Sequence, residues 1–323
     1  MTRLTTDLHP DLRQDVLDAL FKKSIFTTLC FVQKNSNLLS NITGLPYDKI
    51  LKIKDVILLK YSSPLKRGDK YYLGTIKHCA IIPSGIKQLD SILDGGFMTG
   101  NIYEVCGLEG SGKTQLCMSV ALNICLTSPH QVLFMDTKYD ISVQRLVQML
   151  SAQNVFNMSR VLEKIKICHP TSACKLLNDL HHLKTSLSQC SERYLGFKLI
   201  IIDSLPILFQ SFYNFAEGNT VLNKIANIMK MLVVEYHLAI LITNFVTSWT
   251  SETSSGDSEI EMPVNFSRVE MPALGKYWAY VPNVRIMSRK RGCSDECYLT
   301  ILKSQCQPTG KTVKIEICDA GIT

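Results

Sequence analysis

The chain has 323 residues, 46% of them hydrophobic and 20% charged, with a formal net charge of +7 at pH 7. This is the composition of a globular protein, long enough for one core of about 200–250 residues beside a smaller unit. No run approaches the roughly 18 uninterrupted apolar residues of a transmembrane helix, and the N-terminus lacks the apolar core of a signal peptide. We therefore expect a soluble intracellular protein without a membrane partner.

The positive charge is concentrated in the first quarter of the chain. Residues 1–77 contain ten Lys and three Arg against seven Asp, which makes +6 and leaves only +1 for the remainder. A basic patch of this kind attracts phosphate backbones. A solvated lysine-rich face is an equally good interpretation of the charge by itself.

Residues 1–61 are predicted to form a small helical N-terminal domain. Apolar residues recur at helical spacing from 7 to 21, and the pattern returns from 46 to 60. Segment 62–83 is less periodic and contains two prolines and two glycines, so it is predicted to be a linker.

From residue 84 to residue 323, strand and helix patterns alternate along the chain. Short apolar strands separated by helices predict a parallel sheet that is covered on both faces. The expected strands are 102–106, 132–135, 165–168, 199–202 and 238–242, and the expected helices are 114–126, 143–150, 171–183 and 221–236. Three later strand-like runs without intervening helices predict added antiparallel strands at one edge: 284–287, 298–302 and 313–317.

Residues 107–114 read GLEGSGKT, which fits the P-loop pattern GxxxxGK followed by Ser or Thr. The glycines let backbone N–H groups point at phosphate oxygens, and the following helix adds its positive end. Lys113 would reach the β- and γ-phosphates of ATP, and the Thr114 hydroxyl would bind Mg²⁺. The predicted nucleotide-binding residues here are Gly107, Gly110, Ser111, Gly112, Lys113, Thr114 and Gln115.

A P-loop needs a carboxylate at the end of a neighbouring buried strand to hold the metal. Residues 198–203 read KLIIID, so an apolar strand ends in Asp203. Asp203 is therefore the predicted second Mg²⁺ ligand beside Thr114, with a strand-ending cap as the structural alternative.

Several short motifs resemble those of the RecA-like recombinases of eukaryotes and archaea. Residues 84–90 (SGIKQLD) and 93–96 (LDGG) are similar to the family's lead-in to the P-loop. Residues 113–117 (KTQLC) are typical of the paralogues that assist the main recombinase, and residues 272–275 (PALG) and 307–310 (QPTG) are most similar to the D paralogue. The resemblance implies an α/β fold: a RecA-like P-loop ATPase core after a small helical domain.

The resemblance also assigns roles near the nucleotide and shows departures from the family pattern. It implies that Arg145 stacks on adenine. The family's water-polarising Glu is replaced by Lys138, and the Gln that senses the γ-phosphate is replaced by Phe245. Loss of a general base removes about 10²–10⁴-fold of rate. Asp140 is the tentative substitute base, so we expect ATP binding with slow hydrolysis that single-stranded DNA could stimulate.

The two loops that grip DNA in this family are altered here. The first, 205–220, contains no Lys or Arg, and its possible stacking platforms for bases are Phe209, Phe212, Tyr213 and Phe215. The second, 247–271, contains five acidic residues against Arg268 alone, so it repels phosphate. The basic N-terminal region is therefore the better candidate for contact with single-stranded DNA.

The resemblance implies a nuclear ATP-binding subunit that joins other recombinase paralogues in a hetero-oligomer. Such a subunit would help assemble or stabilise the recombinase filament on single-stranded DNA during recombinational repair. Two alternatives remain at this stage: an ATP-driven strand-exchange recombinase, and an unrelated P-loop ATPase or kinase.

Overall fold

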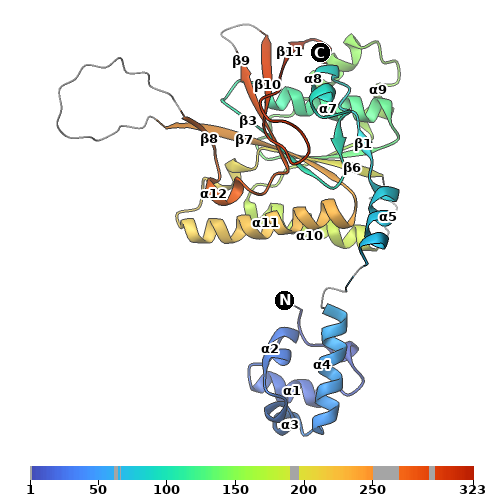
Figure 1. Cartoon of the computed structure of the whole chain (residues 1–323), viewed down its shortest axis with the longest axis vertical. Helices are drawn as coiled ribbons and strands as arrows, with labels where there is room; N and C mark the ends of the chain where they lie inside the picture. The colour runs from blue at the N-terminus through green and yellow to red at the C-terminus, as the bar shows by residue number, and fades with distance from the viewer. Residues whose placement is uncertain (1, 62–64, 66, 190–195, 250–268, 291–294) are drawn as a thin grey trace, which may run out of the picture. The chain divides into compact units, whose positions relative to one another are not determined.

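The computed structural model describes residues 1–323 except 1, 62–64, 66, 190–195, 250–268 and 291–294. The chain divides into two compact units, residues 1–76 and residues 77–323 (Figure 1). In the described part of the chain, no helix is both long and apolar enough to cross a membrane.

The first unit is a set of short helices around its own apolar core. Its elements are η1 (Thr6–Leu8), α1 (Gln14–Lys22), α2 (Thr28–Gln33), α3 (Ser36–Thr43), α4 (Tyr47–Tyr61) and α5 (Gly68–His78), of which the last crosses into the second unit. Thr27 and Asn35 cap helices α2 and α3 with side-chain oxygens, and Gly44 ends α3 in the left-handed conformation. Ile50, Ile53 and other buried aliphatic residues of α1, α3 and α4 fill the core.

The helices of this region differ in two ways from the pattern in the sequence. The apolar repeat over 7–21 is not one helix, because Pro10 lacks an N–H donor and keeps the preceding residue, His9, extended between η1 and α1. The segment predicted as a linker contains α5, a helix that the sequence pattern did not indicate. This helix buries none of its residues, so it lacks the one-sided apolar pattern by which helices are recognised.

Truncation of Ile53 to alanine is expected to destabilise the first unit by about 2–5 kcal/mol, because the side chain is fully buried in a small core. Limited proteolysis of the full chain would detect this as faster cleavage within residues 1–61. Ile81→Ala, at a half-exposed position, is the control and should leave that cleavage rate unchanged.

The second unit is built on a ten-stranded sheet, in the order β12-β11-β10-β9-β3-β7-β6-β4-β5, with β8 paired to β7. The parallel strands are β3 (Ile102–Gly107), β4 (Gln131–Asp136), β5 (Ile165–Cys168), β6 (Phe197–Asp203) and β7 (Ala239–Trp249). β9 (Val284–Lys290) runs parallel to β3. The antiparallel strands are β10 (Glu296–Lys303), β11 (Thr312–Cys318), β12 (Gly321–Ile322) and β8 (Val269–Pro272). A separate pair joins β1 (Ile81–Ile82) to β2 (Phe97–Met98).

Helices cover both faces of this sheet (Figure 1). The buried cluster on one face includes residues of α6 (Lys87–Ile92), α7 (Lys113–Thr127), α8 (Val143–Ala152) and α9 (Met158–Leu162). The cluster on the other face includes residues of α10 (Ala173–Ser188), η2 (Pro206–Phe209), α11 (Phe215–Glu235) and α12 (Gly275–Trp278). Alternate residues of a strand enter opposite clusters, as Leu199 and Ile200 do. The predicted fold class, a mostly parallel α/β sheet with added C-terminal antiparallel strands, is confirmed.

The strand register brings polar residues together at the carboxyl edge of the sheet. Asp136 at the end of β4 is paired with Asp203 at the end of β6. β7 lies between β6 and β3. Val105 of β3 is paired with Thr243 of β7, and β3 ends two residues later at Gly107. Sites in open α/β sheets form at this edge, and the fold places the P-loop and Asp203 there on either side of β7.

Candidate nucleotide-binding site

The P-loop runs from β3 into α7 and is supported by the C-terminal strands. Gly110 and Gly112 have φ angles of 75° and 85°, in the region that favours glycine. The Ser288 hydroxyl donates a 2.6 Å hydrogen bond to the carbonyl of Ser111. A Cβ on Gly112 would come within 2.9 Å of Ile317 on β11. These contacts with β9 and β11 hold the backbone of the loop at the N-terminus of α7. The helix dipole favours an anion at that end.

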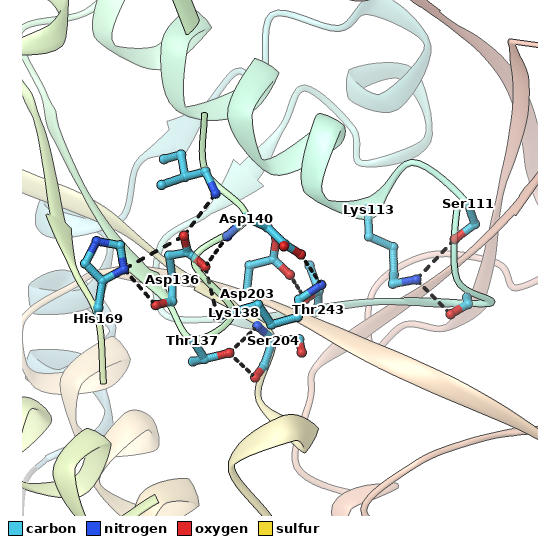
Figure 2. Close-up of polar contacts among 12 residues, drawn as sticks. Ser111, Lys113, Asp136, Thr137, Lys138, Asp140, His169, Asp203, Ser204 and Thr243 are labelled. Carbon is cyan, nitrogen blue, oxygen red and sulfur yellow. Dashed lines mark hydrogen bonds and ion pairs between the residues drawn. The ribbon is translucent and has the colours of Figure 1, made fainter. Parts of the chain in front are cut away.

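Lys113 folds back onto this loop. Its ammonium donates to the carbonyls of Gly107 (2.9 Å) and Leu108 (2.7 Å) and to the Ser111 hydroxyl (3.3 Å), as Figure 2 shows for Ser111. Burial, followed by the charge of Lys138, lowers the pKa of Lys113. The carbonyl contacts are neutral, so an incoming phosphate would supply the negative charge that this buried cation lacks.

A cavity of about 740 Å³ opens above the loop, within the range of small-molecule sites. Its lining includes Lys138 and Asp140, which follow β4, and Phe245 and Val246 of β7. Ile207 and Gln210 also line it. The predicted P-loop residues line it as a group: Gly107, Gly110, Ser111, Gly112, Lys113, Thr114 and Gln115.

Asp203 carries an unsatisfied oxygen at the edge of this site. The residue is 1% exposed, and its Oδ1 accepts a 2.5 Å hydrogen bond from the Thr243 hydroxyl. Its Oδ2 is buried without a hydrogen-bond partner among the described residues. Buried carboxylate oxygens are rarely left unpaired, and carboxylate and hydroxyl oxygens are the ligands that Mg²⁺ prefers. The orphaned oxygen therefore fits a bound Mg²⁺ held by Asp203 and Thr114.

The turn after β4 is fixed by Asp136, which sequence reasoning did not single out. Its Oδ1 accepts from the backbone N–H groups of Lys138 (3.0 Å) and Asp140 (3.2 Å), and its Oδ2 from that of Ile141 (3.0 Å). Thr137 both donates to the Ser204 carbonyl and accepts from its N–H at 2.8 Å, which joins the ends of β4 and β6 (Figure 2). An aspartate at a strand end followed by a short polar turn was the available signal.

Lys138 and Asp140 form an ion pair of 2.8 Å at this turn. Burial opposes the charge on Lys138, but the Asp140 hydrogen bond and the charges of Asp203, Asp140 and Asp136 prevail and raise the pKa of the lysine. The ammonium groups of Lys138 and Lys113 lie 5.8 Å and 5.9 Å from the ring centre of Phe245. Asp140, the predicted substitute base, therefore lines the cavity, but the ammonium of Lys138 already contacts one of its oxygens.

Arg145 is not among the residues that line the cavity, but it contacts one that is. Its Nε donates a 3.0 Å hydrogen bond to Gln115, which does line the cavity, and its Nη2 donates to the Cys318 carbonyl at 2.5 Å. The residue thus joins the start of α7 to the end of β11. Its stacking on adenine stays a prediction.

The aromatic residues predicted as base-stacking platforms are only partly available. Phe209 and Phe212 stack on each other, with ring centres 5.7 Å apart. Both pack against the buried cluster that includes residues of α10, α11 and α12. Tyr213 is fully exposed. The side chain of Phe215, and residues 250–268 of the second loop, lie outside the described residues. Phe209 and Phe212 are therefore partly buried by partners from the core, and base stacking on the predicted aromatic residues stays a prediction.

The fold and site define a P-loop nucleotide-binding protein with a RecA-like core. Residues 76–323 match the Rad51 family, and residues 1–60 match the family described as the RAD51D N-terminal domain. The chain belongs to the Rad51 family, which excludes the unrelated P-loop kinase considered above.

Its relatives include DNA repair protein RAD51 homolog 4 of Mus musculus, which is 27% identical over 99% of this chain and 96% of the relative. The protein of the same name in Bos taurus is 26% identical over 98% of this chain and 96% of the relative. DNA repair protein RAD57 of Saccharomyces cerevisiae is 30% identical over 49% of this chain and 36% of the relative. The resemblance to a recombinase paralogue of the D type is thereby confirmed.

Proposed function

We propose that this chain is an ATP-binding recombinase paralogue that acts in homologous-recombination DNA repair. It would join other paralogues in the nucleus and help assemble or stabilise the recombinase filament on single-stranded DNA. The observation that carries the proposal is a complete phosphate-binding loop facing two substitutions, Lys138 and Phe245. These substitutions favour a nucleotide-dependent subunit over an ATP-driven strand-exchange recombinase.

In this proposal each predicted site residue has a defined task. Backbone N–H groups of Gly107, Gly110, Ser111 and Gly112 surround the phosphates, and Lys113 exchanges its carbonyl contacts for phosphate oxygens. Thr114 and Asp203 hold Mg²⁺, which when bound neutralises phosphate charge. Gln115 and Arg145, already hydrogen-bonded to each other, form the adenine side of the site.

Hydrolysis would be slow because Lys138 and Phe245 stand at the two positions where the family has its water-polarising Glu and its γ-phosphate-sensing Gln. Phe245 has no group that can hydrogen-bond a phosphate or a water, and Asp140 is paired with Lys138. The carboxylate of Asp140 would act as a base only after Lys138 leaves it.

The test is ATP turnover of the purified chain, measured beside ATP binding, with and without single-stranded DNA. We expect binding with turnover near the background rate, unchanged by DNA. Brisk turnover stimulated by DNA would contradict the proposal, because it requires a working base, and would favour the recombinase alternative.

Contact with single-stranded DNA is assigned to the first unit. Its exposed lysines include Lys52 and Lys60, while Lys49 is paired with Asp11 at 2.8 Å. The double variant Lys52→Ser, Lys60→Ser should lower the slope of log affinity against log salt by about 1.4, or about 0.7 for each lost phosphate contact. Fluorescence anisotropy with oligo(dT), titrated at salt concentrations between about 50 and 200 mM, would measure this slope. An unchanged slope would place the DNA contact elsewhere, and Lys166→Ser with Lys175→Ser, both exposed in the second unit, is the control.

A further inference from the structure

Lys138 lines the P-loop cavity although it comes from the end of another strand. Its backbone N–H is held by Asp136, and its side chain is only 21% exposed. Figure 2 shows it among Asp140, Asp203 and Thr243, at the edge of the sheet where β4 and β6 end. The cation is therefore built into the site by a fixed turn and is not a solvated surface lysine.

Two ammonium groups approach the same aromatic ring from within this cavity. Lys113 and Lys138 lie 5.9 Å and 5.8 Å from the ring centre of Phe245, close enough for a cation–π attraction but without a hydrogen-bond acceptor there. Lys113 contacts neutral carbonyls, and Lys138 has a single carboxylate partner at 2.8 Å. Two cations gathered in one partly buried cavity repel each other, and an anion between them would relieve that repulsion.

We propose that Lys138 is a second phosphate-binding cation, which binds the terminal phosphate of a nucleoside triphosphate and lets the site distinguish ATP from ADP. The proposal rests on nucleotide binding at the P-loop. A P-loop surrounds the first two phosphates and its lysine reaches the β- and γ-phosphates. The third phosphate then extends toward the ends of β4 and β6, where Lys138 lies, and a diphosphate ends short of it.

Binding would exchange one partner of Lys138 for another. Asp140 is 49% exposed, and an ion pair with so exposed a carboxylate is weak. A terminal phosphate carries more charge and several acceptor oxygens, so it is the stronger partner for the ammonium. Asp140 then turns to solvent, away from the terminal phosphate, so its release does not place a base at the reacting group. The state of the Lys138–Asp140 turn reports whether the bound nucleotide has a third phosphate.

The first test compares ATP and ADP affinity of Lys138→Met with that of the unaltered chain, by calorimetric titration with Mg²⁺ present. We expect the ATP dissociation constant to rise about 10- to 100-fold, the usual range for a charge-assisted hydrogen bond, while that for ADP stays within about twofold. Lys138→Arg should retain most of the preference for ATP. Lys166→Met, at an exposed position on β5, is the matched control and should change neither constant.

The second variant, Asp140→Asn, separates this role from a merely structural one. Both Lys138→Met and Asp140→Asn remove the ion pair, so a structural role changes ATP affinity in the same direction in both. The proposal predicts opposite directions: Asp140→Asn frees Lys138 and removes a repelling carboxylate, so ATP should bind several-fold more tightly.

Equal losses for ATP and ADP in Lys138→Met, or weaker ATP binding in both variants, would overturn the assignment of Lys138. Failure of the unaltered chain to bind either nucleotide would instead overturn the proposed nucleotide site itself. Circular dichroism of each variant establishes that the compared chains are folded.

Discussion

Substitution of Lys113 by alanine is expected to weaken ATP binding by at least about 100-fold. The lysine is 7% exposed, and its ammonium is held on the P-loop by three oxygen atoms. Loss of charge-assisted hydrogen bonds to phosphate costs about 1.5–3 kcal/mol each, and every 1.4 kcal/mol is a factor of ten. Calorimetric titration of ATP into the two chains is the measurement.

The control for this experiment is Lys166→Ala, because Lys166 is exposed and lies on β5 at the far edge of the sheet. ATP binding of Lys113→Ala within threefold of the unaltered chain would show that the P-loop does not bind nucleotide.

Removal of Mg²⁺ by a chelator should weaken ATP binding in the unaltered chain, because Asp203 then keeps an unsatisfied oxygen next to the phosphates.

Substitution of Glu104 by leucine is expected to destabilise the second unit by about 3–5 kcal/mol. Glu104 is fully buried on β3 and accepts hydrogen bonds from Asn244 (2.6 Å), from the indole of Trp278 (2.7 Å) and from Arg285. Removal of the carboxylate leaves the buried guanidinium uncompensated, which is the costly way to break a buried ion pair. Unfolding in urea, followed by circular dichroism, would measure the change.

The double variant Glu104→Leu, Arg285→Met tests the cause of that loss. Replacement of both charges by apolar groups removes the unpaired charge, so the double variant should be more stable than Glu104→Leu alone. If it is less stable than that single variant, the cost comes from packing and not from the isolated charge. Glu104→Gln keeps an acceptor for Trp278 and Asn244 and should be intermediate.

Much of the second unit was predictable because its strands are buried on both faces. Runs such as 199–202 are continuously apolar. In a parallel sheet covered on both faces every side chain of a strand is buried, so such a run indicates a strand of this kind. α5 was missed for the opposite reason: Tyr71, Tyr72 and Leu73 are exposed, so no buried face marks the helix. Strand β12 is two residues long and forms only because β11 is beside it.

The candidate site divides in the same way between local and long-range information. The P-loop is contiguous, so its residues were identified from one motif, and Asp203 followed from the apolar strand before it. The Glu104 network was missed because its partners are 140 to 181 residues away along the chain. The ion pair between Lys138 and Asp140 depends on the turn that Asp136 imposes, and spacing alone does not reveal it.

The attachment of β11 and β12 to the P-loop region makes the codons for residues 317–322 as sensitive to change as those of the motif itself. The N–H of Ile322 donates to the Ser119 hydroxyl on α7 at 3.0 Å, and Arg145 depends on the Cys318 carbonyl. A stop codon before residue 317 would leave the GLEGSGKT sequence intact and yet remove the wall against which Gly112 is packed. A truncated allele of this kind would pass a motif search and still encode a protein whose nucleotide site has lost its support.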